Sequence, residues 1–83
     1  MITADEVWNV MRDHGIIGVM EWMHPNHSLL EDEHNRGQHK YLVRLGDRFF
    51  RIHFYDQYAG GGHYVWEVQP MLVLEFWETR EDN

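Results

Sequence analysis

Apolar residues recur at helical spacing through the first fourteen positions of the chain. Thr3-Ala4-Asp5-Glu6 has the form of a capping box, in which the Thr3 hydroxyl accepts from the amide of Glu6 and the Glu6 carboxylate accepts from the amide of Thr3. Gly15 follows the stripe and suits the positive φ with which many helices end. The spacing therefore predicts a helix over 4–14, with one apolar stripe that must pack on another element. The stripe consists of Ala4, Val7, Trp8, Val10, Met11 and His14.

The next twenty residues carry weaker signals. Residues 16–23 (IIGVMEWM) are apolar and begin with β-branched side chains, which favours a first strand that His24-Pro25-Asn26 ends. Ser28-Leu29-Leu30-Glu31 repeats the capping-box form and Gly37 could end a helix, so a short second helix is expected near 29–35. A loop with a single helical turn would give the same pattern.

From Lys40 to Thr79 the chain alternates with a period of two residues, which is typical of strands. Gly46-Asp47 predicts a two-residue hairpin turn, because glycine tolerates the positive φ that such turns need. Residues 56–63 form a longer connection with three successive glycines, and Gln69-Pro70 precedes the last predicted strand at 72–77. One face of the sheet is expected to hold the core, with Tyr41, Val43, Leu45, Phe50, Ile52, Phe54, Tyr64, Trp66, Val68, Leu72, Leu74 and Phe76. The opposite face is expected to hold Arg44, Arg51, His53, Tyr55, Glu67, Gln69, Glu75 and Trp77.

These patterns predict an α+β fold. The N-terminal helix packs on one face of a four- to five-stranded antiparallel meander, and the other face stays in contact with water. Residues 1–83 make a single domain, because 83 residues are near the lower limit for a chain that buries its own core. The polar residues 79–83 are expected to fray. The small core and an apolar edge strand at 71–77 together favour a homodimer.

Cysteine is absent, which excludes disulfides, cysteine-ligated zinc and thiol catalysis. Small secreted domains usually depend on disulfides, so a chain without them is expected in the cytoplasm. Met1 leads into Ile2-Thr3-Ala4-Asp5-Glu6 without the basic and long apolar start of a signal peptide. No run approaches the ~20 apolar residues of a membrane span, so we expect no association with a membrane.

The formal net charge of −7 is unevenly distributed. Residues 1–35 and 52–83 are acidic, whereas residues 36–51 carry five Lys or Arg against one Asp. An acidic protein is repelled by phosphate backbones, so direct binding to nucleic acid is not expected. The central basic block weakens that argument locally without reversing it.

Four of the seven histidines lie between positions 24 and 39, interleaved with acids. If residues 29–35 were helical, His27, Glu31 and His34 would fall on one stripe, and His24 could join them as a fourth ligand for zinc or a similar ion. The spacing lacks the two histidines and glutamate of zinc proteases. A solvated polar loop is therefore the favoured interpretation, and a metal-binding module or small hydrolase is the alternative. No cofactor is predicted.

No complete catalytic signature is present. The glycines at 60–62 join two strands and lack the Lys-Ser/Thr of a phosphate loop, and the chain contains a single serine, Ser28, outside any nucleophile motif. The polar face of the sheet instead carries Trp, Tyr and Arg, the residues in which interface centres are enriched. The residues expected to bind a partner are Arg44, Arg51, His53, Tyr55, Glu67, Glu75 and Trp77.

The segment from Lys40 to Arg80, with a Leu45-Gly46-Asp47-Arg48-Phe49-Phe50-Arg51 hairpin and a Val68-Gln69-Pro70-Met71 junction, resembles short bacteriophage proteins in style. In size, acidity and layout the chain is similar to small phage-encoded accessory proteins, including early host-takeover proteins and inhibitors of bacterial defence such as anti-CRISPR proteins. The resemblance covers half of the chain and assigns no functional residue. It implies a non-enzymatic protein that works in the host cytoplasm by occupying a surface of a host or defence protein.

Two further functions are compatible with the sequence. The first is nucleic-acid mimicry, in which acidic side chains occupy the phosphate-binding groove of a partner. These acids are Glu31, Asp32, Glu33, Glu75, Glu78, Glu81 and Asp82. Arg44, Arg51 and the aromatic residues could instead sequester a nucleotide signal, which would raise the melting temperature of the protein.

Overall fold

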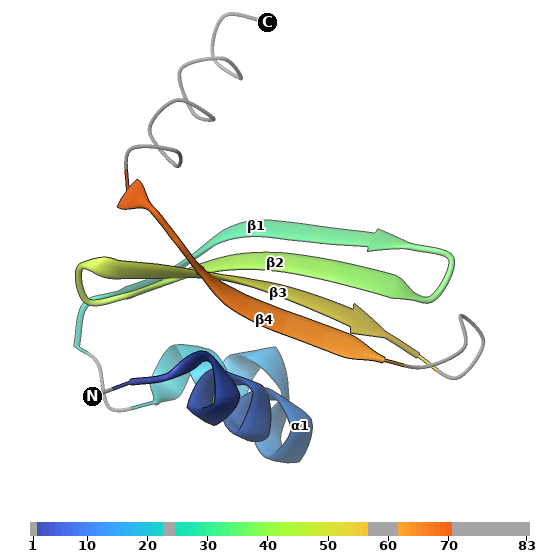
Figure 1. Cartoon of the computed structure of the whole chain (residues 1–83), viewed down its shortest axis with the longest axis horizontal. Helices are drawn as coiled ribbons and strands as arrows, with labels where there is room; N and C mark the ends of the chain where they lie inside the picture. The colour runs from blue at the N-terminus through green and yellow to red at the C-terminus, as the bar shows by residue number, and fades with distance from the viewer. Residues whose placement is uncertain (1, 23–24, 57–61, 71–83) are drawn as a thin grey trace, which may run out of the picture.

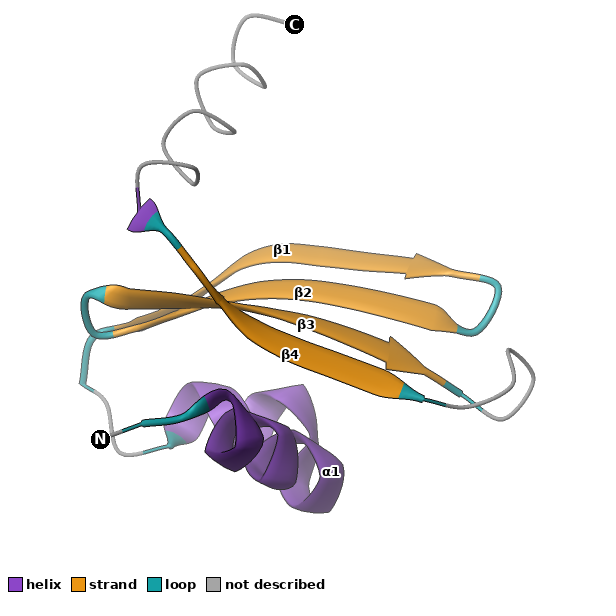
Figure 2. Cartoon of the chain, viewed as in Figure 1, coloured by secondary structure: helices purple, strands orange, loops and turns teal. Residues whose placement is uncertain are grey.

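The computed structural model of the chain describes residues 2–22, 25–56 and 62–70. In this part of the chain the sheet has four antiparallel strands in the order β1-β2-β3-β4, and α1 lies against one face of it (Figure 1). The elements are α1 (Ala4–Glu21), β1 (His27–Asn35), β2 (Gln38–Leu45), β3 (Arg48–Tyr55) and β4 (His63–Val68). The predicted α+β fold, a helix packed on an antiparallel meander, is confirmed (Figure 2).

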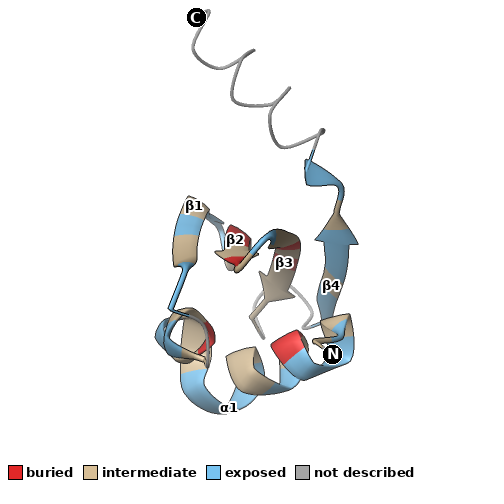
Figure 3. Cartoon of the chain, turned by 90° about the vertical axis from the view of Figure 1, so that its left-hand side faces the viewer, coloured by how far each residue is buried: buried red, intermediate tan, exposed pale blue. Residues whose placement is uncertain are grey.

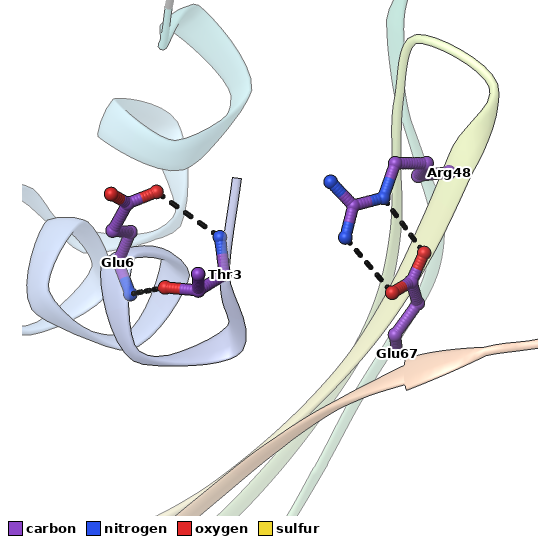
Figure 4. A network of polar contacts seen from close by, with 4 residues as sticks. All are labelled: Thr3, Glu6, Arg48 and Glu67. Atoms are coloured by element: carbon purple, nitrogen blue, oxygen red, sulfur yellow. Dashed lines mark hydrogen bonds and ion pairs between the residues drawn. The ribbon is translucent and has the colours of Figure 1, made fainter. Parts of the chain in front are cut away.

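The capping box predicted at the start of α1 is present. The amide of Glu6 donates to Thr3 Oγ1 over 3.2 Å, and the amide of Thr3 donates to Glu6 Oε2 over 3.1 Å (Figure 4). These two bonds satisfy amides that the first helical turn leaves without partners inside the helix. They fix where the helix begins.

Gly15 interrupts α1 without ending it. Its φ of 74° and ψ of −176° are not helical, so the helix bends there and then continues to Glu21. Beyond the bend, Gly18 lies so close to His14 that an added Cβ would come 2.2 Å from the His14 Cβ. Glycine is therefore required at both positions: Gly15 allows the bend, and Gly18 leaves room for the His14 side chain.

The strand predicted over 16–23 is wrong, because residues 16–21 belong to α1. Val19 is fully buried, and Ile16 and Met20 pack against the core, which is the i, i+3, i+4 spacing of a helix. A short apolar run with β-branched residues fits a buried helix and a strand equally well, and a glycine with positive φ can bend a helix as well as end it.

The short helix predicted near 29–35 is also wrong, since this segment forms β1 and pairs with β2 along its length. Arg36 and Gly37, with φ of 50° and 80°, make the tight turn between the two strands. The capping-box form at 28–31 was therefore coincidental, and pairing with β2 overrides the local signal. A charged edge strand such as β1 also resists pairing with other chains.

The hairpin predicted at Gly46-Asp47 is confirmed, since β2 ends at Leu45 and β3 begins at Arg48. The turn is tied to the segment before β1 by a 2.8 Å bond from the Gly46 amide to the Asn26 carbonyl. The predicted strand at 72–77, the edge proposed at 71–77 and the tail at 79–83 lie outside the described residues.

The core lies between α1 and the sheet. The alternation predicted for β2 and β3 is confirmed from Tyr41 to Leu45 and from Phe50 to Ile52, where every second residue is buried on the face that carries the helix. The buried cluster consists of Val7, Val19, Tyr41, Val43, Leu45, Phe50 and Ile52.

The face predicted for β4 is wrong. Ile52 pairs with Val65, which packs against the core, so the residues on either side of Val65 point away from α1. Tyr64, Trp66 and Val68 therefore lie on the opposite face from the one expected. A shift of one residue after the glycine-containing connection reverses every side chain of the strand.

Within the described residues, no helix has the length and apolar character needed to cross a membrane.

Candidate functional site: the open face of the sheet

The face of the sheet turned away from α1 is covered by no helix or strand among the described residues (Figure 3). We call it the open face. The strand register aligns its side chains in rows that cross all four strands. The first row is Ser28, Arg44, Phe49 and Val68; the second is Glu31, Leu42, Arg51 and Trp66; the third is Glu33, Lys40, His53 and Tyr64.

The second row explains why a leucine can be buried on a face that no helix covers. Leu42 is 1% exposed. Its register neighbours Glu31 on β1 and Arg51 on β3 form an ion pair, Arg51 Nη1 to Glu31 Oε2, of 3.1 Å. Because Leu42 stands between these two strands, the pair spans its side chain. The side chains of Glu31 and Arg51 are only 13% and 21% exposed, so these two residues and Leu42 form a small patch that excludes water and is stabilised by the ion pair.

Arg44, in the first row, has no carboxylate partner among the described residues. Its Nη2 donates to Ser28 Oγ over 3.1 Å, and its Nε is buried without a hydrogen-bond partner. A buried guanidinium N–H without an acceptor costs free energy, and the Arg44 side chain would have to turn outward before a carboxylate or carbonyl oxygen could reach the Nε and recover it. Arg44 is thus the strongest unsatisfied donor on the open face.

The third row combines a cation with an imidazole. Burial lowers the pKa of His53, and the positive charges of Lys40 and Arg51 lower it further, while Glu31 and Glu33 act in the opposite direction. No ion pair of Lys40 is found among the described residues. The row therefore keeps an unpaired ammonium beside an imidazole that favours its neutral form.

Aromatic rings on β4 complete the open face. Tyr64 is 62% exposed and Trp66 is 41% exposed. The edge of the His53 ring meets Trp66 with the centroids 4.8 Å apart, and Tyr55 meets Tyr64 in the same manner at 6.2 Å. The face can therefore offer charge, hydrogen bonds and stacking to a ligand, the chemistry of recognition.

Four of the predicted partner-binding residues, Arg44, Arg51, His53 and Tyr55, lie together on the open face. Two others, Glu75 and Trp77, lie outside the described residues. The sequence missed the contribution of Lys40, Tyr64 and Trp66. For Lys40 the alternation of β2 was a sufficient signal, whereas the two aromatic residues depended on the register of β4.

Glu67, the remaining predicted partner-binding residue, is on the face that carries α1, because it pairs with the buried Phe50. Its carboxylate instead binds Arg48 through two bonds, 2.7 Å from Nε and 2.9 Å from Nη2 (Figure 4). This bond pattern lowers the pKa of Glu67. The Arg48 guanidinium also lies 5.2 Å from the centre of the Phe50 ring, so this pair is engaged within the chain although it is partly exposed.

The residues of the alternative metal site do not gather. A strand of ~3.3 Å per residue places His27 and His34 roughly 23 Å apart, and Glu31 is engaged by Arg51. His24 lies outside the described residues. Within the part of the chain that the structure describes, no three His, Asp or Glu side chains are arranged to hold a metal ion.

A histidine cluster does form on the face that carries α1. His34 contacts Asp32 through Nε2 and its cross-strand neighbour His39 through Nδ1. The two imidazole rings lie 5.7 Å and 6.4 Å from the Tyr41 ring. The cluster fastens the ends of β1 and β2, and the sequence could not show it while 29–35 was taken as a helix.

A groove of about 540 Å³ follows the bend of α1. Its lining comes from this helix and the residue after it, so it is a surface furrow of one element. The lining residues are Val10, His14, Ile17, Gly18, Glu21 and Trp22.

The chain matches no protein family, no curated protein and no solved structure.

Proposed function

We propose that the protein is a non-enzymatic binding protein that holds a segment of a partner protein on the open face. The expected role is that of an inhibitor or modulator, as for phage-encoded proteins directed at a host or defence protein. The partner segment presents carboxylates next to apolar side chains. The observation that carries the proposal is Arg44, a central cation with a buried Nε that lacks an acceptor.

The surroundings of Arg44 support an acidic and partly apolar partner. Lys40 adds a second cation without a carboxylate among the described residues. Phe49 borders Arg44 on β3, and Trp66 follows on β4 one row along. Arginine and tryptophan are the residue types that most often dominate binding free energies at interfaces.

Charge favours a protein segment over a nucleic acid. The open face combines its cations with Glu31 and Glu33 on β1, and the whole chain carries a net charge of −7. A long polyanion such as a nucleic acid would be repelled by that net negative charge. A short acidic segment of a protein can bind to the local cations of the open face alone. A nucleotide could use the same cations and rings, so it serves as a competitor in the test.

The test uses the full chain as bait in a bacterial lysate, with Arg44→Gln and Arg12→Gln as matched baits. Arg12 lies on α1 and pairs with Asp13, away from the open face. We expect a captured protein that Arg44→Gln loses and Arg12→Gln keeps. With that protein purified, Arg44→Gln should weaken binding by about tenfold or more, since hydrogen bonds to charged groups contribute about 1.5–3 kcal/mol.

Two outcomes contradict the proposal. In the first, the partner binds equally to both variants, which would place the interface elsewhere. In the second, nucleotides raise the melting temperature of the wild-type protein but not of Arg44→Gln, and no protein is captured differentially. The open face would then hold a small anionic ligand.

A further inference from the structure

We infer that β4 is a dimerisation edge, at which two copies of the chain join their sheets into one eight-stranded sheet. In the described part of the chain β4 pairs only with β3, so one side of the strand presents unpaired amides and carbonyls. Such an edge is a template for another strand, and small proteins either protect it or use it.

The exposed side chains of β4 mark this edge for use. Four large apolar side chains are exposed among the described residues, and two of them, Tyr64 and Trp66, belong to this six-residue strand. The opposite edge strand, β1, carries four Asp, Glu or His side chains over residues 31–34 instead. The two edges of the sheet therefore differ: the charged β1 disfavours pairing with a strand of another chain, whereas the apolar side chains of β4 favour it.

The sequence of β4 is complementary to itself in one antiparallel register. A two-fold axis perpendicular to the sheet keeps the open faces of both copies on the same side. Each residue of β4 must therefore pair with a residue of the second copy that lies on the same face of the sheet. An axis through Val65 pairs Val65 with Val65 of the second copy and Tyr64 with Trp66 of the second copy. It also places His63 opposite Glu67 of the second copy, but the His63 ring is already stacked on Trp8 with the ring centroids 3.5 Å apart.

The neighbouring register is less favourable. An axis through Trp66 would place Val65 opposite Glu67 of the second copy, an apolar side chain against a carboxylate. The register through Val65 avoids this mismatch and forms two aromatic pairs.

Dimerisation would also change the recognition surface. The open faces of both copies would form one continuous surface, with Tyr64 and Trp66 of each copy at its centre and Arg44 on either side. The aromatic part of the open face is thus incomplete in a single copy. This inference stands on the edge of the sheet and does not depend on which partner the open face binds.

The test compares two double variants that remove the same aromatic residues. In Tyr64→Lys/Trp66→Lys, each lysine faces a lysine of the second copy. In Tyr64→Lys/Trp66→Glu, each lysine faces a glutamate of the second copy. Both positions are exposed, and circular dichroism should confirm that each variant folds.

Mass is measured by analytical ultracentrifugation from low micromolar to near-millimolar concentration. We expect the wild-type chain and the Lys/Glu variant to reach twice the monomer mass, and the Lys/Lys variant to stay monomeric. A control substitution, Ile17→Lys on the exposed side of α1, should leave the dimer unchanged.

Three results would overturn the inference. The wild-type chain could remain monomeric at every concentration with its β4 amides protected from hydrogen exchange, which would mean that residues of the same chain cover the edge. Its mass could grow without reaching a limit at the dimer. The two double variants could dimerise equally, which would exclude this register.

Discussion

His53 shows how one residue on the open face couples folding to pH. Its pKa lies below the ordinary value of 6.5 because the ring is partly buried and because Lys40 and Arg51 are close. Below 6.5 the unfolded chain therefore binds more protons at this position than the folded chain does. The contribution of His53 to stability is complete above that value and is lost as the pH falls through the pKa of the folded state.

A His53→Gln variant should lose less stability on acidification than the wild-type protein. Urea denaturation at a series of values between about pH 7 and pH 5 gives the free energy of unfolding of both chains. We expect the difference between them to change with pH in that window, with the wild-type protein falling more steeply.

Lys40→Gln provides the companion measurement. It keeps the imidazole and removes one of the charges that lower its pKa. Its dependence on pH should lie between those of the wild-type protein and His53→Gln, because burial, the largest cause, remains. Parallel curves for all three proteins would show that His53 titrates alike in the folded and unfolded chains.

At the scale of elements, the sequence predicted most reliably where two signals agree. In β2 and β3 the alternation and the Gly46-Asp47 turn point to the same hairpin, and the structure contains it. Over 16–21 the glycine signal gave way to packing of the helix on the core, and over 27–35 the capping-box form gave way to pairing with β2. The register of β4 could not be predicted, because the alternation of β3 does not continue through the glycine-containing connection. The sequence therefore does not show which residues of β4 face α1.

The same limit explains the candidate site. Arg44, Arg51, His53 and Tyr55 were correctly grouped because they alternate within one hairpin. The ion pair between Glu31 and Arg51, which covers Leu42, joins β1 to β3. These strands are not neighbours in the sheet, so no local sequence pattern could predict the pair.

The pair between Glu31 and Arg51 should be strongly coupled in a double-mutant cycle. Glu31→Gln, Arg51→Gln and the double variant are compared with the wild-type protein by urea denaturation. Each single variant leaves a partly buried charge without its partner, so we expect a loss of about 1–3 kcal/mol and a clear coupling energy.

The matched cycle uses Arg48→Gln and Glu67→Gln. This pair has the shorter distances, but nearly half of the Glu67 side chain is exposed. Solvent screening should make its coupling smaller than that of Glu31 and Arg51. The reverse order would mean that distance outweighs burial in this sheet, and that Leu42 is covered by something other than the charge pair.

For the molecule as a whole, stability depends on a single layer of side chains between α1 and the sheet. Most of the fully buried residues belong to this layer. Among the described residues, the open face adds only Leu42 to the fully buried set, under the pair of Glu31 and Arg51. An 83-residue chain with one such layer is expected near the lower end of the usual 5–15 kcal/mol of folding free energy.

Phe49 and Phe50 are adjacent in β3 and point to opposite faces, which makes them a direct test of this arrangement. Phe50 is fully buried under α1, so Phe50→Ala should cost about 3–5 kcal/mol, most of the available stability. Phe49 on the open face is partly exposed, and Phe49→Ala should cost less than half as much. Thermal and urea denaturation of the two variants measure the difference, at ~4–8 °C in melting temperature per kcal/mol for a domain of this size. Equal losses would show that the open face is covered as completely as the core, and the binding surface proposed there would then be inside the protein.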